Sequence, residues 1–252
     1  MEAVFTTGRG VSQDLSKFAL EIGAIVFMVN FKIQSPFLHA RINSINLKNL
    51  GINKMSYSQF TLEMVEQVFG LSIIEKLDSF AEIPEAPISS FLKQCLEYNT
   101  PLALEISTEK ARSEMIIAPI LIELKQQLGS KISLFSGREF NVDSQQGLMG
   151  YCDFIISKSP SQLLIKSPVI LIVEAKNDNI QSGLGQCIAE MVAAQIVNQR
   201  QSNNEMIYGA VTTGTNWKFM KLFDSVVEID PNEYFLNNVA KLMGILRSFI
   251  GS

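Results

Sequence analysis

The sequence predicts an α/β fold in which a mixed β-sheet is flanked by helices. Two observations lead to this prediction. Short runs rich in β-branched and aromatic residues, punctuated by Gly and Ser-Pro, fill residues 131–176 and 206–229. Segments with helical spacing of apolar residues precede, separate and follow these runs. The order helix, strands, helix, strands, helix is typical of an α/β sandwich.

The first 54 residues differ from the rest of the chain, and a small segment separates them from the main domain. Residues 1–54 combine a Gly/Thr/Ser-rich start, a short apolar run and an Asn-rich segment without a sustained period. We expect them to form a poorly ordered extension. Residues 55–106 begin with MSYSQFTLEMVEQVFG, where Ser and Thr can cap helices. This segment is predicted to be a small helical appendage, followed by the main domain over 107–252.

The main domain is predicted to open with a helix that Ser107 or Thr108 caps and Gly129 closes. Pro119 inside this pattern predicts a kink, or a helix that starts near Pro119. The other predicted elements are strands at 131–136, 138–143, 150–157 and 167–176, a helix at 183–200, strands at 206–214, 217–223 and 225–229, and a final helix at 235–250.

Composition narrows the function classes. A net charge of −4 means that any binding of nucleic acid must use a local basic patch. His39 is the only histidine, which excludes Ser-His-Asp triads and histidine-rich zinc sites. Three widely separated cysteines favour a reducing cytoplasm. The uncharged apolar run 22–31 is about half of the ~20 residues that a spanning helix needs, so no membrane partner is expected.

Charged residues end one strand and interrupt another. In PVILIVEAK, alternation places Glu174 and Lys176 on the same face at the end of a strand that is apolar on both faces. Asp153 lies between Cys152 and Phe154, inside a second predicted strand. If the two strands are neighbours, the carboxylates of Asp153 and Glu174 approach and repel each other.

A divalent cation between the two carboxylates would relieve this repulsion. Hard oxygen ligands suit Mg²⁺, with Mn²⁺ as a substitute. Such a cation makes a water molecule easier to ionise, as hydrolysis of a phosphodiester requires. Lys176 beside it could hold a phosphate oxygen or orient the attacking water.

The pattern of a helical acid, then Asp153 in YCDF, then Glu174-Ala175-Lys176 in VEAK resembles the PD-(D/E)XK nuclease superfamily. The resemblance covers about residues 107–222 and implies a restriction-endonuclease-like core. It further implies that Asp153, Glu174 and the backbone carbonyl of Ala175 bind the metal ion and that Lys176 assists catalysis. The stretch from GLGQCIAEM to WKFMKL is also similar to uncharacterised cyanobacterial-type members.

Two further positions follow from the resemblance. The helical acid would be Glu114, with Glu109 as the competing choice, and the glutamine that several members carry on the next helix would be Gln186. The sequence departs from the family pattern twice, since Cys152 replaces a proline and Glu190 replaces a tyrosine. A substrate-facing role for Glu190 is therefore not expected.

Aromatic and basic residues near 208–221 offer a separate candidate for a nucleic-acid surface. Trp217 and Phe219 share one face of a predicted strand, however, and are expected to pack in the core. Lys218 would then point outward.

These observations favour a Mg²⁺-dependent nuclease that hydrolyses phosphodiester bonds in DNA. The alternative is a catalytically inactive module on the same fold that binds nucleic acid or protein, which the acidic net charge favours. A metabolic α/β enzyme is the third reading, although the chain has no cofactor fingerprint. The sequence identifies no interface, so it leaves undecided whether the chain forms a homodimer.

Overall fold

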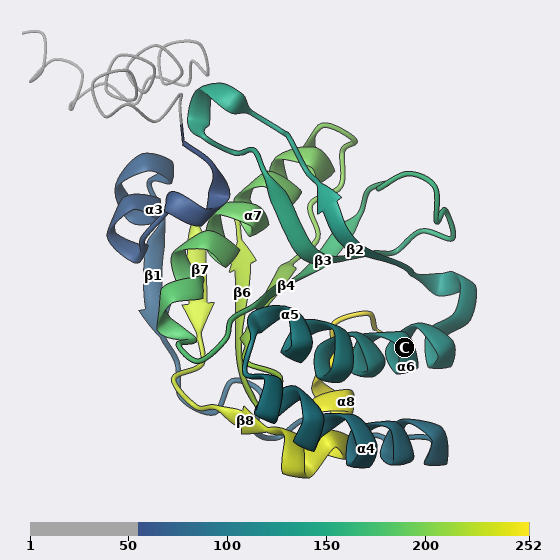
Figure 1. Ribbon diagram of the computed structural model, residues 1–252. Coiled ribbons are helices and arrows are strands. Elements are labelled where there is room, and N and C mark those ends of the chain that lie inside the picture. The colour runs from purple at the N-terminus through teal and green to yellow at the C-terminus, as the bar shows by residue number, and fades with distance from the viewer. Residues whose placement is uncertain (1–54, 252) are drawn as a thin grey trace, which may run out of the picture. The chain divides into compact units, whose positions relative to one another are not determined.

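The computed structural model describes residues 55–251, which lie in one compact unit. The expectation for residues 1–54 falls outside the described residues. The described part is a mixed α/β fold, as predicted, with an eight-stranded sheet between two groups of helices (Figure 1).

The sheet has the strand order β1-β7-β6-β5-β4-β3-β2, and β8 pairs with β6. The pairs β1–β7 and β4–β5 are parallel and the others are antiparallel, so the sheet is mixed. The strands are β1 (Ser72–Glu75), β2 (Ser133–Glu139), β3 (Tyr151–Ser157), β4 (Val169–Ala175), β5 (Ile207–Thr212), β6 (Asn216–Phe223), β7 (Val226–Ile229) and β8 (Tyr234–Phe235).

Helices cover the sheet on both sides and enclose two apolar cores. One core joins the sheet to α3 and α7, and the other joins it to α4, α6 and α8 (Figure 1). The helices are α3 (Leu62–Phe69), α4 (Ser90–Ile106), α5 (Glu109–Arg112), α6 (Ala118–Leu128), α7 (Gln181–Gln199) and α8 (Val239–Ser248). Short helical turns are η2 (Tyr57–Gln59), η3 (Ser113–Ile117), η4 (Gly129–Lys131), η5 (Ser144–Gln146) and η6 (Leu236–Asn238).

Strand β4 lies in the interior of the sheet between β3 and β5. All of its residues are buried. Ile172 belongs to the core under α7, whereas Val173 belongs to the core under α4, α6 and α8. The continuous apolar run of this strand is thus explained by helices on both faces.

Residues 55–106 are more than a helical appendage. Besides η2, α3 and α4, they contribute β1, which pairs with β7 in register from Ser72–Val226 to Glu75–Ile229. Leu92, Leu96 and Ala103 of α4 are buried in one of the two cores. The segment is therefore structurally part of the same unit as the rest of the sheet.

The predicted strand at 138–143 does not form as a separate strand. Strand β2 extends to Glu139, and the chain then continues as an irregular hairpin arm. Phe140 and Val142 donate backbone hydrogen bonds to Gly150 and Leu148 without making a regular ladder. The seven residues of β2 thus combine residues 133–136 of the first predicted strand with residues 138–139 of the second.

The helical segment 109–128 shows how the chain accommodates Pro119. Between α5 and α6 the turn η3 is a π-helix, in which Ala118 donates to the carbonyl of Ser113. Proline has no N–H to donate to the carbonyl of Met115, four residues earlier. The side-chain amide of Asn99 donates to that carbonyl instead, at 3.1 Å. The irregularity predicted at Pro119 is therefore a widened turn that α4 stabilises.

Candidate active site

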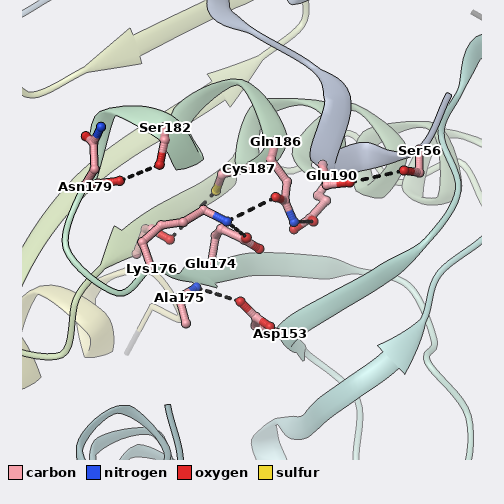
Figure 2. Close-up of polar contacts among 12 residues, drawn as sticks. Ser56, Asp153, Glu174, Ala175, Lys176, Asn179, Ser182, Gln186, Cys187 and Glu190 are labelled. Atoms are coloured by element: carbon pink, nitrogen blue, oxygen red, sulfur yellow. Dashed lines mark hydrogen bonds and ion pairs between the residues drawn. The ribbon is translucent and has the colours of Figure 1, made fainter. Parts of the chain in front are cut away.

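Asp153 and Glu174 lie beside each other on adjacent antiparallel strands. Phe154 of β3 pairs with Val173 of β4, so the next pair outward is Asp153 with Glu174. Asp153 Oδ2 accepts a hydrogen bond of 2.7 Å from the backbone N–H of Ala175. Asp153 is thus fixed at the point where the two strands separate (Figure 2).

A chain of hydrogen bonds connects Glu174 with α7 (Figure 2). Lys176 Nζ lies 2.6 Å from Glu174 Oε1 and 3.2 Å from Gln186 Oε1. The amide of Gln186 donates in turn to Glu190 Oε1 at 3.1 Å. Because Glu190 accepts from the amide nitrogen, the amide oxygen of Gln186 is directed toward Lys176.

Gly183 makes room for Lys176 beneath the first turn of α7. A Cβ at this position would lie 2.9 Å from Lys176 Cε and 2.7 Å from Val211 Cγ1, both shorter than van der Waals contact. The glycine therefore allows the helix to approach the end of β4 closely. This close approach brings Gln186 within hydrogen-bonding distance of Lys176.

Two of the three acidic side chains of the site are almost completely buried. Glu174 is 2% exposed and Glu190 is 0% exposed. Burial raises the pKa of Glu174, and the negative charges of Glu190 and Asp153 raise it further. Burial also raises the pKa of Glu190, against the opposing effect of its hydrogen bond with Gln186. Both groups therefore hold protons more tightly than exposed glutamates do.

Asp153 and Lys176 respond to the same surroundings. Burial raises the pKa of Asp153, while the Ala175 N–H and the charge of Lys176 act to lower it. Burial would lower the pKa of Lys176, but Glu174 outweighs this effect and the pKa is raised. Lys176 carries the one positive charge in a cluster with three carboxyl groups, those of Asp153, Glu174 and Glu190. The cluster therefore has a net negative charge when all three carboxyl groups are ionised.

Binding of a divalent cation by this cluster stays a prediction. Glu174 Oε2 and Glu190 Oε2 are buried and have no hydrogen-bond partner among the described residues. Across residues 55–251, no group of three or more His, Cys, Asp or Glu side chains is arranged to hold a metal ion. Magnesium sites need only one or two carboxylates, with water completing the coordination. Asp153 and Glu174 would supply two, and their role as ligands, like that of the Ala175 carbonyl, stays a prediction.

The two candidates for the helical acid lie in different surroundings. Glu114 is in η3, its side chain is 59% exposed, and it forms an ion pair of 2.6 Å with Lys110. Glu109, at the start of α5, is one of the charges that raise the pKa of Lys176. The electrostatic coupling to Lys176 therefore favours Glu109 as the acid near the cluster.

Two contributors to the site were not assigned a role from the sequence. Glu190 is buried within the cluster, and Gly183 sets the distance between α7 and Lys176. The spacing of Gln186 and Glu190 already indicates side chains on the same helix face. The burial of Glu190 depends on packing between α7 and the sheet, which a helical spacing does not specify.

The aromatic and basic residues near 208–221 do not form an exposed surface. Trp217 and Phe219 are fully buried, as predicted. Tyr208 stacks on Phe249 with ring centroids 4.1 Å apart. Lys218 is 5% exposed and donates to the carbonyl of Pro231, so its predicted outward orientation is wrong.

Within the part of the chain that the structure describes, no helix is long and apolar enough to cross a membrane. No protein-family model matches the chain, and no curated protein matches it either. The function must accordingly be inferred from the geometry of the site.

Proposed function

We propose that the chain is a metal-dependent nuclease that hydrolyses phosphodiester bonds in DNA. The observation that carries the proposal is the position of Asp153 and Glu174 on adjacent strands, with Lys176 bonded to Glu174. Two carboxylates and one ammonium group at the same strand ends suit a divalent cation and a phosphate. The unpartnered Glu174 Oε2 further supports an additional ligand at this position.

The order of elements around the site supports a restriction-endonuclease-like core. Helix α6 is followed by the antiparallel strands β2, β3 and β4, then by α7 and by β5, which is parallel to β4. Asp153 and Glu174 come from the second and third of these strands, and Gln186 comes from the helix that follows them. These are the relative positions that the sequence pattern implies.

Asp153 and Glu174 would hold the Mg²⁺ ion, together with the carbonyl of Ala175. When bound, Mg²⁺ would supply positive charge and lower the pKa of a water molecule. Lys176 would stabilise the negative charge that develops on the phosphate oxygens. Gln186 accepts a hydrogen bond from Lys176 Nζ. It would hold the ammonium group in place when Lys176 leaves Glu174 and contacts the substrate phosphate.

Binding of the cation can be tested without a substrate. Mn²⁺ should raise the melting temperature of the full chain, because a ligand that binds only the native state stabilises it. Glu174→Ala should abolish this rise. Glu205→Ala, which removes a carboxylate paired with Lys158 elsewhere, is the matched control and should keep the rise. Equal shifts in all three proteins would exclude this metal site.

Cleavage should be measured on plasmid and single-stranded DNA with Mg²⁺ or with EDTA. We expect cutting only with Mg²⁺, and a loss of about 10²-fold or more in Lys176→Ala, since charge-stabilising groups contribute rate factors of this order. Cutting that depends on Mg²⁺ but is unchanged in Lys176→Ala would contradict the role of the lysine. Mn²⁺ binding without any cutting would instead favour the inactive binding module.

A further inference from the structure

Helix α4 exposes apolar side chains along its outer face. Phe91 is 75% exposed, Tyr98 is 87% exposed and Leu102 is 48% exposed, and the partly exposed Cys95 lies between them. Their spacings of four, three and four residues place all four on one side of the helix. Figure 1 shows α4 at the outer margin of its helical layer. Large apolar side chains grouped in this way mark an interaction surface.

The exposed face continues into a groove between α4 and α6. This cavity has a volume of about 580 Å³, and its lining includes Phe91, Cys95, Pro119 and Ile122. Ile122 of α6 is 49% exposed. The surface is therefore a ridge beside a groove, which is the shape that another helix fits.

We propose that this surface binds the same surface of a second copy of the chain, with the two α4 helices antiparallel. The spacing four-three-four is unchanged when it is read backwards. Around a two-fold axis between Cys95 and Tyr98, each Phe91 then faces Leu102 of the second copy, and each Cys95 faces Tyr98 of the second copy. A two-fold interface requires this kind of self-complementarity, because it uses the same surface on both subunits.

Charge and area are consistent with a second copy as the occupant. Gln94, Asn99 and Pro101 flank the exposed side chains and carry no charge, so direct repulsion is avoided along most of the face. The exposed Glu105 lies on the same side at the end of α4, where the antiparallel arrangement places it beside the N-terminus of the second copy's α4, which favours a negative charge. A standard interface buries about 800 Å² on each partner. Phe91 and Tyr98, which can bury about 150–250 Å² each, provide a large part of that area.

The mass of the full chain in solution tests the proposal and does not depend on the metal site. Light scattering after size exclusion should give the mass of a dimer for the wild type. The double substitution Phe91→Ser with Tyr98→Ser should give a monomer. Leu163→Ser with Leu164→Ser is the matched control, because it removes two leucines that are 85% and 61% exposed in the β3–β4 loop. We expect this control to stay dimeric.

Cross-linking tests the register of the two helices. Cys95 is the partly exposed cysteine of the three, since Cys152 and Cys187 are fully buried. A short bis-maleimide should therefore join two wild-type chains but not two Cys95→Ser chains. In the Cys95→Ser background, Tyr98→Cys should restore the cross-link. Leu104→Cys should not, because Leu104 is 40% exposed but on the other side of α4.

Two results would overturn the proposal. The first is a monomeric wild type, which would mean that the surface is covered by another segment or by a different partner. The second is cross-linking through Leu104→Cys as efficient as through Tyr98→Cys, which would show that α4 does not pair through this face. Neither result bears on Mn²⁺ binding, so the dimer and the nuclease can fail separately.

Discussion

At the scale of single residues, Glu190 couples the stability of the fold to the chemistry of the site. It is fully buried, and its Oε2 has no hydrogen-bond partner among the described residues. Burial raises its pKa, so near neutral pH the folded state holds a proton that the unfolded state has lost. The stability that depends on this group is complete below the ordinary glutamate pKa. It decreases as the pH rises toward the raised value.

Glu190→Gln should therefore make the protein more stable at pH 8 and reduce the fall in stability between pH 5 and pH 8. An uncharged amide removes the cost of burying a carboxylate, and we expect a gain of about 1–3 kcal/mol at pH 8. Urea denaturation at several pH values measures the effect. A variant whose stability has the same pH slope as the wild type would contradict the assignment.

Glu228→Gln is the control with the opposite sign. Burial would raise the pKa of Glu228, but hydrogen bonds from Lys221 and Ser79 and the nearby lysine charges lower it. Its contribution to stability is present above the ordinary glutamate pKa and is lost as the pH falls through the lowered value. The substitution should therefore destabilise the protein at pH 8 and have little effect in strong acid.

At the scale of elements, the close contact between α7 and the end of β4 holds Lys176 in place. Gly183→Ala would put a methyl group against Lys176 and Val211. We expect a loss of about 1–3 kcal/mol in the free energy of unfolding, as for other overpacked sites. The displaced Lys176 should also change the response of the melting temperature to Mn²⁺.

Gly185→Ala separates the loss of stability from the displacement of Lys176. A Cβ at position 185 would collide with the backbone of Phe60 and Thr61 rather than with Lys176. This variant should lose stability as well but keep the Mn²⁺ shift of the wild type. If both variants alter the Mn²⁺ shift equally, the contact between Gly183 and Lys176 does not position the lysine.

The elements also show which features a sequence can predict. The placement of Glu174 and Lys176 on one face at the end of β4 could be predicted, because the alternation of side chains along a strand is a local property and both faces of this strand are apolar. The pairing of β1 was not, since its four residues are mostly exposed and only the distant β7 makes them a strand. Which of Glu109 and Glu114 faces the site could not be predicted, because the direction of each side chain depends on the number of residues per helical turn. The π-helical turn η3 changes that number between α5 and α6.

At the scale of the whole molecule, residues 55–106 complete both cores of the described unit. Phe60 and Val65 are buried on the side of α7, whereas Leu92 and Leu96 are buried on the side of α6 and α8. Strand β1 also covers the edge of β7. Without this segment, apolar surface on both faces of the sheet and the backbone of an edge strand would become exposed.

A chain limited to residues 107–252 should therefore not fold cooperatively, although it contains every residue assigned to the candidate site. Each fully buried large apolar side chain contributes about 1.5–3 kcal/mol, so the loss of several exceeds the 5–15 kcal/mol by which a domain is typically stable. Urea denaturation followed by circular dichroism should show a cooperative transition for residues 55–252 and none for residues 107–252. Equal midpoints for the two chains would show that the sheet and its site are independent of the first helices.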